Sequence, residues 1–340
     1  MDTFSHIIGQ DHVIDSLRKA YLSDRLPHGL VFSGPVGVGK ALTARALGTL
    51  FLCEKPTADQ ACGKCHSCHL VAANTHPDFH LIYKELIRFH DKTGKSKGTE
   101  LSIEVLRNEL VRPASQKSIQ GRGKVFVVEQ AELMNTAAQN AILKTLEEPS
   151  GRTLIILLSD QSSSLLPTIF SRCQVMHFVR LEAQVVEELL ARHKLDPALT
   201  SASALYSDGS IGNAIRWIKE GMIAAAMELS RRMDELIQGR LVEGMAEWLK
   251  ASAEAYANAQ LERDELASKD QANREGLVLL LGFAANHFRM RMRQVPENRL
   301  NPLCDAIEAI LKTEGYINSN VSVGLLLQHL SVTLQQIFVK

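Results

Sequence analysis

Residues 28–47, HGLVFSGPVGVGKALTARAL, decide the fold of this chain. An apolar run at 28–34 leads into GPVGVGKA at 34–41, which fits the pattern G-x-x-x-x-G-K through Lys40. A strand before such a loop and a helix after it place backbone N–H groups and the lysine where phosphate oxygens bind. The candidate phosphate-binding residues are therefore Gly34, Gly37, Gly39 and Lys40.

Two features of this candidate nucleotide site depart from what hydrolysis requires. A working P-loop carries Ser or Thr after the lysine to hold Mg²⁺, whereas this chain has Ala41. The apolar run KVFVVEQ at 124–130 ends in Glu129 and Gln130, and the amide of Gln130 cannot accept a proton as a general base would. The sequence therefore predicts a P-loop fold that has lost ATP hydrolysis, and it leaves open whether Lys40 still holds a nucleotide.

The segments around this loop predict an α/β domain, because short apolar runs alternate with helical patterns, as in a parallel sheet covered on both faces. The predicted strands are 28–34, 78–85, 124–130, 153–160 and 173–179, and the predicted helices are 10–26, 40–52, 135–148 and one that Ser102 caps. Beyond about residue 180 only helical patterns remain. We therefore expect a P-loop domain over 1–180, a small helical domain over 181–222 and a larger helical domain over 223–340.

The composition is that of an ordinary globular chain, with 45% hydrophobic and 22% charged residues among 340. Thirty-eight basic side chains balance 38 acidic ones, so any contact with DNA must come from a local patch or from a partner. No apolar run approaches the ~20 residues of a membrane span, and the start, MDTFSHIIGQDH, lacks the apolar core of a signal peptide. We therefore expect a cytoplasmic protein.

Four of the six cysteines fall between positions 53 and 68. In a reducing compartment such a cluster indicates a metal rather than disulfides, and four thiolates are the ligands of a closed, tetrahedral structural Zn²⁺ site. The predicted zinc ligands are Cys53, Cys62, Cys65 and Cys68. An Fe–S cluster or unligated thiols are the alternatives, although typical ferredoxin runs space their cysteines differently.

Five further residues carry simpler predictions. Four sulfur atoms would already saturate a zinc ion, so we expect the nearby His66, His69 and His76 to lie at the surface. Cys173 and Cys304 sit among apolar neighbours in the sequence, and we expect both to be small buried hydrophobic residues.

Several longer motifs point to one family. They are IIGQDHV at 7–13, RLPHGLVFSGPVGVGK at 25–40, NAILKTLEEP at 140–149 and SRC at 171–173, together with the four-cysteine module. These segments resemble the AAA+ subunits of the bacterial DNA polymerase III clamp loader, densely over residues 5–180 and thinly beyond. The resemblance implies an AAA+ P-loop domain, a small helical lid domain and an all-helical C-terminal collar domain through which subunits assemble.

The family contains two kinds of subunit. The gamma/tau kind binds and hydrolyses ATP, whereas the delta-prime kind keeps the fold without hydrolysis. This chain departs from the gamma/tau pattern at Ala41, Glu129, Gln130 and Gly212, the last being where active subunits carry a phosphate-sensing arginine. These departures favour the delta-prime kind. An active DNA-dependent ATPase of gamma/tau type is the alternative, supported by the intact GxxxxGK, and a zinc finger that reads nucleic acid ranks last.

The resemblance also assigns a role to Arg172. In the family, the arginine of the SRC motif reaches into the ATP site of the neighbouring subunit, where it would neutralise charge on the transferred phosphoryl group. The alternative is that Arg172 pairs only with a carboxylate of its own chain. The implied partners are gamma/tau and delta subunits in a hetero-oligomer and, through it, the sliding clamp and primed DNA. The implied function is to help the DNA polymerase III holoenzyme load that clamp.

Overall fold

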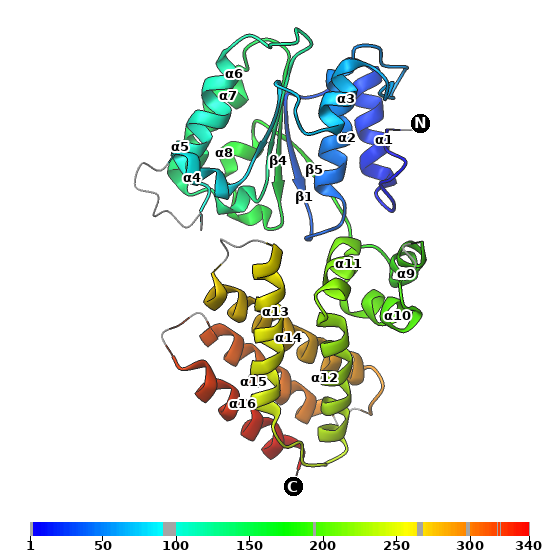
Figure 1. Cartoon of the computed structure of the whole chain (residues 1–340), viewed down its shortest axis with the longest axis vertical. Coiled ribbons are helices and arrows are strands. Elements are labelled where there is room, and N and C mark those ends of the chain that lie inside the picture. The colour runs from blue at the N-terminus through cyan, green and yellow to red at the C-terminus, as the bar shows by residue number, and fades with distance from the viewer. Residues whose placement is uncertain are drawn as a thin grey trace. The chain divides into compact units, whose positions relative to one another are not determined.

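The computed structural model describes residues 3–90, 100–192, 195–263, 268–296, 300–317, 319 and 321–339. The chain divides into two compact units, Met1–Leu181 and Glu182–Lys340 (Figure 1). The first unit is an α/β domain and the second, as far as it is described, is helical. The predicted fold class, an α/β domain with a parallel sheet covered by helices on both faces and followed by a helical region, is confirmed.

The first unit is built on a five-stranded parallel sheet with the strand order β2-β3-β4-β1-β5. Its strands are β1 (Gly29–Ser33), β2 (Phe79–Ile82), β3 (Lys124–Val128), β4 (Thr153–Ser159) and β5 (Gln174–His177). The three inner strands are buried along their whole length, as their continuous apolar sequences predict, whereas the edge strands β2 and β5 are partly exposed. All five predicted strands are therefore present, although β2 is shorter than predicted.

The pairing of β1 with β4 positions the candidate nucleotide site. Ser33, the last residue of β1, pairs with Ser159, the last residue of β4. The glycine loop leaves β1 at Gly34 and Asp160 follows β4 directly, so both begin at the same edge of the sheet. Carboxyl ends of neighbouring parallel strands are where ligand sites of open α/β sheets form.

Helices cover both faces of the sheet, and each face has its own hydrophobic core. One face packs against α1 (Asp11–Leu22) and α2 (Lys40–Leu52), with α3 (His66–Ala72) beside α2 (Figure 1). The other face carries α5 (Ile103–Leu106), a π-helical turn η2 (Arg107–Val111), α6 (Arg112–Ser115), α7 (Thr136–Glu147) and α8 (Pro167–Phe170). The core of this second face also includes residues of the short helices η1 (Lys84–Leu86) and α4 (Ile87–His90) and of the 3-10 turn η3 (Ala131–Leu133), and η3 contacts the 3-10 turn η4 (Ser162–Ser164).

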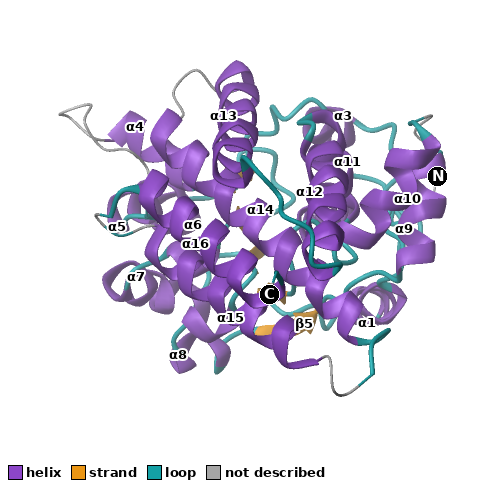
Figure 2. Ribbon diagram, turned by 90° about the horizontal axis from the view of Figure 1, so that it is seen from below, coloured by secondary structure: helices purple, strands orange, loops and turns teal. Residues whose placement is uncertain are grey.

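The second unit consists of eight helices in its described part (Figure 2). They are α9 (Ala183–Ala191), α10 (Pro197–Tyr206), α11 (Ile211–Lys219), α12 (Met222–Ile237), α13 (Met245–Arg263), α14 (Lys269–Met292), α15 (Leu300–Ile317) and α16 (Val323–Phe338). Trp217 of α11 lies edge-on to Phe283 of α14, with 5.1 Å between ring centroids, inside one hydrophobic core that extends to α16. The predicted lid (181–222) and collar (223–340) thus share a core, and their separation into two domains stays a prediction.

No helix in the described ranges is both long enough and apolar enough to span a membrane.

Candidate nucleotide and metal sites

Glycine backbone conformations shape the loop between β1 and α2. Gly34, Gly37 and Gly39 all have positive φ angles, of 154°, 73° and 103°. A Cβ atom added to Gly34 would lie 2.4 Å from the carbonyl oxygen of Phe178, so no larger residue fits there. The loop ends at Gly39, which is the N-cap of α2 and has no side chain with which to cap it. The first N–H groups of this helix therefore point toward the loop, as in an anion-binding P-loop.

The ammonium group of Lys40 is held by the loop itself. Lys40 is only 7% exposed, and its Nζ donates hydrogen bonds to the carbonyl oxygens of Gly34 (2.5 Å) and Pro35 (2.6 Å). A third bond, of 2.6 Å, goes to Oδ1 of Asp160, which follows β4. A nucleotide phosphate would have to compete with a carboxylate for this lysine. Asp160 was not among the predicted site residues; the apolar run TLIILLSD at 153–160 predicts that it follows a strand but not that it pairs with Lys40.

The position after the lysine offers no metal-binding hydroxyl. Ala41 is exposed on the first turn of α2. The nearest hydroxyl along the helix, on Thr43, is fully buried and donates to the carbonyl oxygen of Gly39 at 2.9 Å. That hydroxyl is therefore committed to the helix backbone and does not replace the missing Mg²⁺ ligand.

The acidic end of β3 lies next to the same helix. Glu129 is half-buried, and burial raises the pKa of its carboxyl group, with a smaller contribution from the neighbouring charge of Glu85. It lines a cavity of about 610 Å³ that Ala41 also lines. Gln130 is exposed and adopts a left-handed backbone conformation with φ of 51°. Glu129 is therefore near the position of a metal-supporting carboxylate, without an acidic neighbour that could serve as a base.

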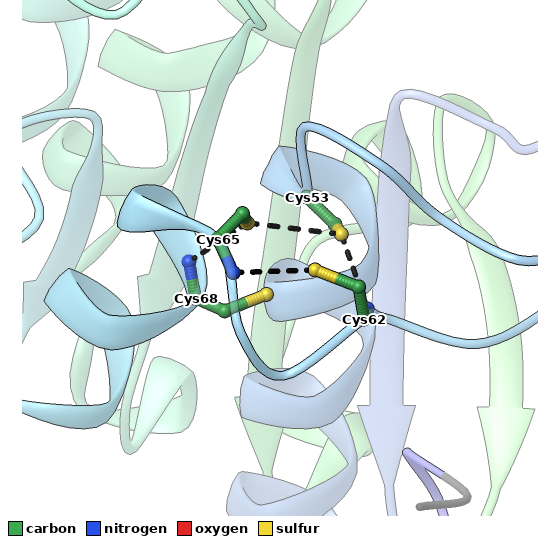
Figure 3. Close-up of side chains that lie close together, drawn as sticks. All are labelled: Cys53, Cys62, Cys65 and Cys68. Atoms are coloured by element: carbon green, nitrogen blue, oxygen red, sulfur yellow. Dashed lines mark hydrogen bonds between the residues drawn. The ribbon is translucent and has the colours of Figure 1, made fainter.

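The four clustered cysteines form a compact set of sulfur ligands (Figure 3). Cys53 follows the last residue of α2, Cys62 lies in the connecting loop, and α3 provides Cys65 as its N-cap and Cys68 in its first turn. All four sulfur atoms lie within 4.8 Å of one another, and those of Cys53 and Cys65 are 4.0 Å apart. Tetrahedral zinc with Zn–S bonds of ~2.3 Å places its sulfur atoms roughly 3.8 Å apart, so the cluster fits one such ion.

The surroundings of the sulfur atoms favour thiolates at some positions and oppose them at others. The backbone amide of Lys64 is the main cause that lowers the pKa of Cys62 to about 6. Burial raises the pKa values of Cys53 and Cys68. Backbone N–H groups also donate to sulfur, from Cys65 to Cys62 at 3.3 Å and from Cys62 to Cys53 at 3.2 Å. A bound cation would supply a positive counter-charge that stabilises the buried thiolates.

The predictions for the remaining histidines and cysteines are confirmed in part. His66 and His69 are exposed, and Cys173 is buried, which raises the pKa of its thiol to about 12. Two predictions are wrong. His76 is buried, because its ring packs inward and bonds to Oγ of Ser67 in α3. Cys304 is exposed, because it lies on the outward face of α15 despite its apolar neighbours in sequence.

Arg172 lies just beyond α8 and is paired within its own chain. Its Nε donates to Oε1 of Glu147 at 2.6 Å, its Nη2 contacts the same oxygen, and its Nη1 donates to the carbonyl oxygen of Thr168 at 2.9 Å. The side chains of Arg172 and Glu147 are 28% and 46% exposed. The intrachain pairing, which was the alternative to a role in trans, is therefore present, but as a partly solvated ion pair of the kind worth only ~0–1 kcal/mol.

Gly212, the remaining departure from the gamma/tau pattern, is exposed on the first turn of α11.

Residues 9–182 match the protein family described as "DNA polymerase III, delta subunit". The chain belongs to this family. The resemblance to clamp-loader subunits of delta-prime type, which the sequence motifs carried, is thereby confirmed.

Named relatives agree with the family match. The DNA polymerase III subunit delta′ of Pseudomonas aeruginosa is 41% identical over 146 residues, which cover 43% of this chain and 41% of that relative. The DNA polymerase III subunit delta′ of Bacillus subtilis is 25% identical over 338 residues, which cover 96% of each chain. The DNA polymerase III subunit tau of Salmonella typhimurium is 27% identical over 314 residues, which cover 90% of this chain and 46% of that relative. The chain thus spans less than half the length of the Pseudomonas and Salmonella relatives.

Proposed function

We propose that this chain is a non-hydrolysing subunit of a DNA polymerase III clamp loader. In this role it assembles with gamma/tau and delta subunits and helps the complex place a sliding clamp on primed DNA. Family membership supports the general assignment, and the altered P-loop supports the absence of hydrolysis. Its own contribution is a rigid assembly surface and a guanidinium group offered to an adjacent ATP site.

The observation that carries the proposal is the state of Lys40. Its ammonium group already has an ion-pair partner in Asp160 and two carbonyl partners in the loop. Phosphoryl transfer depends almost entirely on positioning and on electrostatic stabilisation of the phosphates. With Ala41 in place of a hydroxyl and Gln130 in place of a base, the remaining groups supply neither the metal nor the activated water that hydrolysis needs.

Arg172 is the proposed arginine finger, acting in trans on a neighbouring ATPase subunit. Its guanidinium group is partly exposed, and its intrachain carboxylate, Glu147, is more exposed still. Phosphate oxygens of a bound nucleotide carry more negative charge than one solvated carboxylate and accept two parallel bonds from a guanidinium group. The free-energy cost for Arg172 to exchange Glu147 for phosphate is therefore small. In this proposal Arg172 pairs with Glu147 in the free subunit and with phosphate in the assembled complex.

We assign a structural zinc ion to Cys53, Cys62, Cys65 and Cys68. Four thiolates complete a tetrahedral shell, so such an ion supplies folding energy and no open position for a reacting water. Its place in the fold is the junction between the C-terminus of α2 and the N-terminus of α3. The connecting segment between these helices has few buried apolar residues of its own, and the metal would replace a hydrophobic core there.

Steady-state ATP turnover by the purified chain, with primed DNA present, tests the absence of hydrolysis. We expect turnover at the level of buffer alone, and the same from the Lys40→Ala variant. An authentic gamma/tau subunit assayed beside it controls for the DNA and the metal. Turnover above background that disappears in Lys40→Ala would overturn the proposal and establish the gamma/tau-type ATPase in its place.

A further inference from the structure

The C-terminus of α2 is capped by side chains from distant parts of the chain. The last carbonyl groups of a helix have no partner within it and must find one elsewhere. The carbonyl oxygen of Leu52 accepts a hydrogen bond from Oγ of Ser67 at 2.9 Å, and that of Cys53 accepts one from Nη2 of Arg122 at 2.6 Å. Ser67 belongs to the cysteine module and Arg122 to the loop that precedes β3. These two bonds are the first and last of a series of hydrogen bonds, called the circuit below, that starts and finishes at neighbouring residues of the chain, Leu52 and Cys53.

From Ser67 the circuit runs inward through a buried histidine. Oγ of Ser67 is 2.9 Å from Nε2 of His76, and Nδ1 of His76 accepts the backbone N–H of Asp78 at 3.0 Å. Because Nδ1 accepts, Nε2 carries the proton and donates to Ser67, whose hydroxyl donates onward to Leu52. Ser67, His76 and Asp78 are 2%, 5% and 2% exposed, so each bond in the series is shielded from water.

Asp78 connects this series to the loop over 116–123. Its Oδ1 accepts the backbone N–H of Ile119 and its Oδ2 accepts that of Gln120, both at 2.7 Å. A carboxylate that accepts two backbone amides forms strong, charge-assisted bonds. Two residues farther along, Arg122 returns to Cys53 and closes the circuit. The loop is therefore held at its tip by Asp78. Its base is held by the bond to the predicted metal ligand Cys53, and also by bonds from Arg152 to Arg122 and from Lys124 to Gln116.

Both ends of the circuit rest on the cysteine module. Ser67 lies between Cys65 and Cys68 on α3, and Cys53 is itself one of the four clustered cysteines. If the four sulfur atoms are not drawn together, the buried thiols of Cys53 and Cys68 no longer fix α3 against the end of α2. Ser67 and Arg122 would then lose their aligned acceptors together.

We propose that Ser67, His76 and Asp78 are positioning residues that couple metal binding by the four cysteines to the conformation of the 116–123 loop. This inference rests on the proposed metal site. Metal binding then holds the backbone of Ile119, a residue that is 73% exposed, in one conformation. Coupling of this kind is reciprocal, so a loop that the metal orders must also strengthen metal binding by the same factor. Arg122 is the member of the series that bonds directly to a predicted ligand residue, Cys53, and outer-shell partners of metal ligands typically contribute about 10–100-fold to affinity.

The experiment measures both directions of this coupling on the full chain. Zinc content and the zinc dissociation constant are determined by competition with a chelator. Amide hydrogen exchange is then compared with and without zinc at Ile119 and Gln120. We expect removal of zinc to accelerate exchange at these two amides at least tenfold. We also expect Asp78→Asn and Ser67→Ala each to weaken zinc binding about tenfold.

A matched control is Gln139→Ala. Gln139 is 3% exposed in the first unit and accepts the backbone N–H of Leu166 at 2.7 Å. Among the described residues, its bonds go to Met134, Ser164 and Leu166, outside the cysteine module. This variant should lose stability without any change in zinc affinity. Exchange at Leu166 in the unmodified chain should not respond to zinc.

The measurements of zinc affinity and amide exchange distinguish the proposed coupling from the metal site itself. Zinc binding with unchanged exchange at Ile119 and Gln120, or with the same zinc affinity in Asp78→Asn, would overturn the coupling and leave the metal site standing. A chain that binds no zinc would overturn both. The comparison of exchange with and without zinc uses the unmodified protein, so it stands even if Asp78→Asn does not fold.

Discussion

The ion pair with Asp160 occupies Lys40, the lysine of the candidate phosphate-binding loop. The lysine that would reach a nucleotide phosphate is neutralised by a carboxylate at 2.6 Å. We expect Asp160→Asn to raise ATP affinity about tenfold, equivalent to ~1.4 kcal/mol, because the amide removes a charge that both competes for Lys40 and repels phosphate. Fluorescence titration with a labelled nucleotide measures the effect. Lys40→Ala in the same background should abolish the gain, and equal affinities for Asp160→Asn and the unmodified chain would show that the carboxylate does not control binding.

Arg172 has two candidate roles, an intrachain ion pair with Glu147 and a finger in trans, and substitutions at Arg172 and at Glu147 distinguish them. We expect Arg172→Ala to leave the chain folded and the complex assembled, since a solvated ion pair contributes only ~0–1 kcal/mol. The DNA-stimulated ATPase activity of the reconstituted complex, and its loading of clamps, should fall substantially. The fall should be partial, because only one interface is affected. Arg172→Lys should restore little, because an ammonium group lacks the planar geometry that grips two phosphate oxygens.

Glu147→Ala is the control for that experiment. It removes the same intrachain pair from the other side and leaves the guanidinium group in place. A finger in trans predicts normal ATPase activity for Glu147→Ala, whereas a purely structural pair predicts that both alanine variants behave alike. An Arg172→Ala complex that assembles and hydrolyses ATP at the unmodified rate would exclude the role in trans.

At the scale of elements, the junction between α2 and α3 depends on its sulfur cluster. Four sulfur atoms within 4.8 Å of one another, two of them on buried cysteines, predict close to one zinc ion per chain in protein purified without added zinc. Replacement of the half-exposed Cys62 by serine should lower the metal content and make the 53–68 segment sensitive to proteolysis. Elemental analysis decides the identity of the metal. Iron with visible absorbance, or four free thiols without metal, would contradict the zinc assignment.

The sequence specified the elements that carry continuous apolar patterns and missed those whose geometry depends on distant partners. Strands such as β4 are buried on both faces, so composition alone identified them. Ser102 does cap the helix that follows it, with the amide of Val105 as donor. The π-helical turn at Arg107–Val111 left no signal, because an extra residue in one turn barely alters apolar spacing.

The same distinction applies within the candidate sites. Cysteine spacing and the glycine pattern are local, so the metal ligands and the P-loop were predicted residue by residue. Asp160 lies 120 residues from Lys40, and Asp78 lies 41 residues from Ile119. Such partners meet only after the sheet has formed, and no pattern in a single sequence records which of the many carboxylates will lie there. The burial of His76 was missed for the same reason.

At the scale of the whole molecule, the two tryptophans report on one unit alone. Trp217 lies in α11 of the predicted lid and Trp248 in α13 of the predicted collar, and the chain has no others. Because Trp217 packs on Phe283 within a shared core, we expect Trp217→Phe, which leaves Trp248 as the only tryptophan, to lower the denaturant midpoint that Trp248 fluorescence reports. An unchanged midpoint at Trp248 would instead support independent lid and collar domains.

A charged cluster that joins α12 to α14 should make the stability of this second unit depend on pH. Burial alone would raise the pKa of Asp234, but hydrogen bonds from Arg291 at 2.8 Å and from His287 at 2.9 Å outweigh it and hold the pKa below its usual 3.8. A carboxyl group with a lowered pKa in the folded state stabilises that state above its unfolded pKa, and the contribution is lost as the pH falls through the folded value.

Asp234→Asn should therefore lower the free energy of unfolding at pH 7 by ~2 kcal/mol, the usual scale for hydrogen bonds to a charged group. At a pH below the lowered folded-state pKa of Asp234, where the carboxyl group of the unmodified chain is itself protonated, the difference should shrink toward zero. Tryptophan fluorescence during denaturant unfolding at both pH values follows the second unit directly, since both indole groups lie there. Asp270→Asn is the matched control, because its carboxylate is 80% exposed in a surface pair with Arg274, and it should change stability by less than about 0.5 kcal/mol at either pH. A loss in Asp234→Asn that is equally large at both pH values would mean that packing, rather than the carboxylate charge, holds α12 against α14.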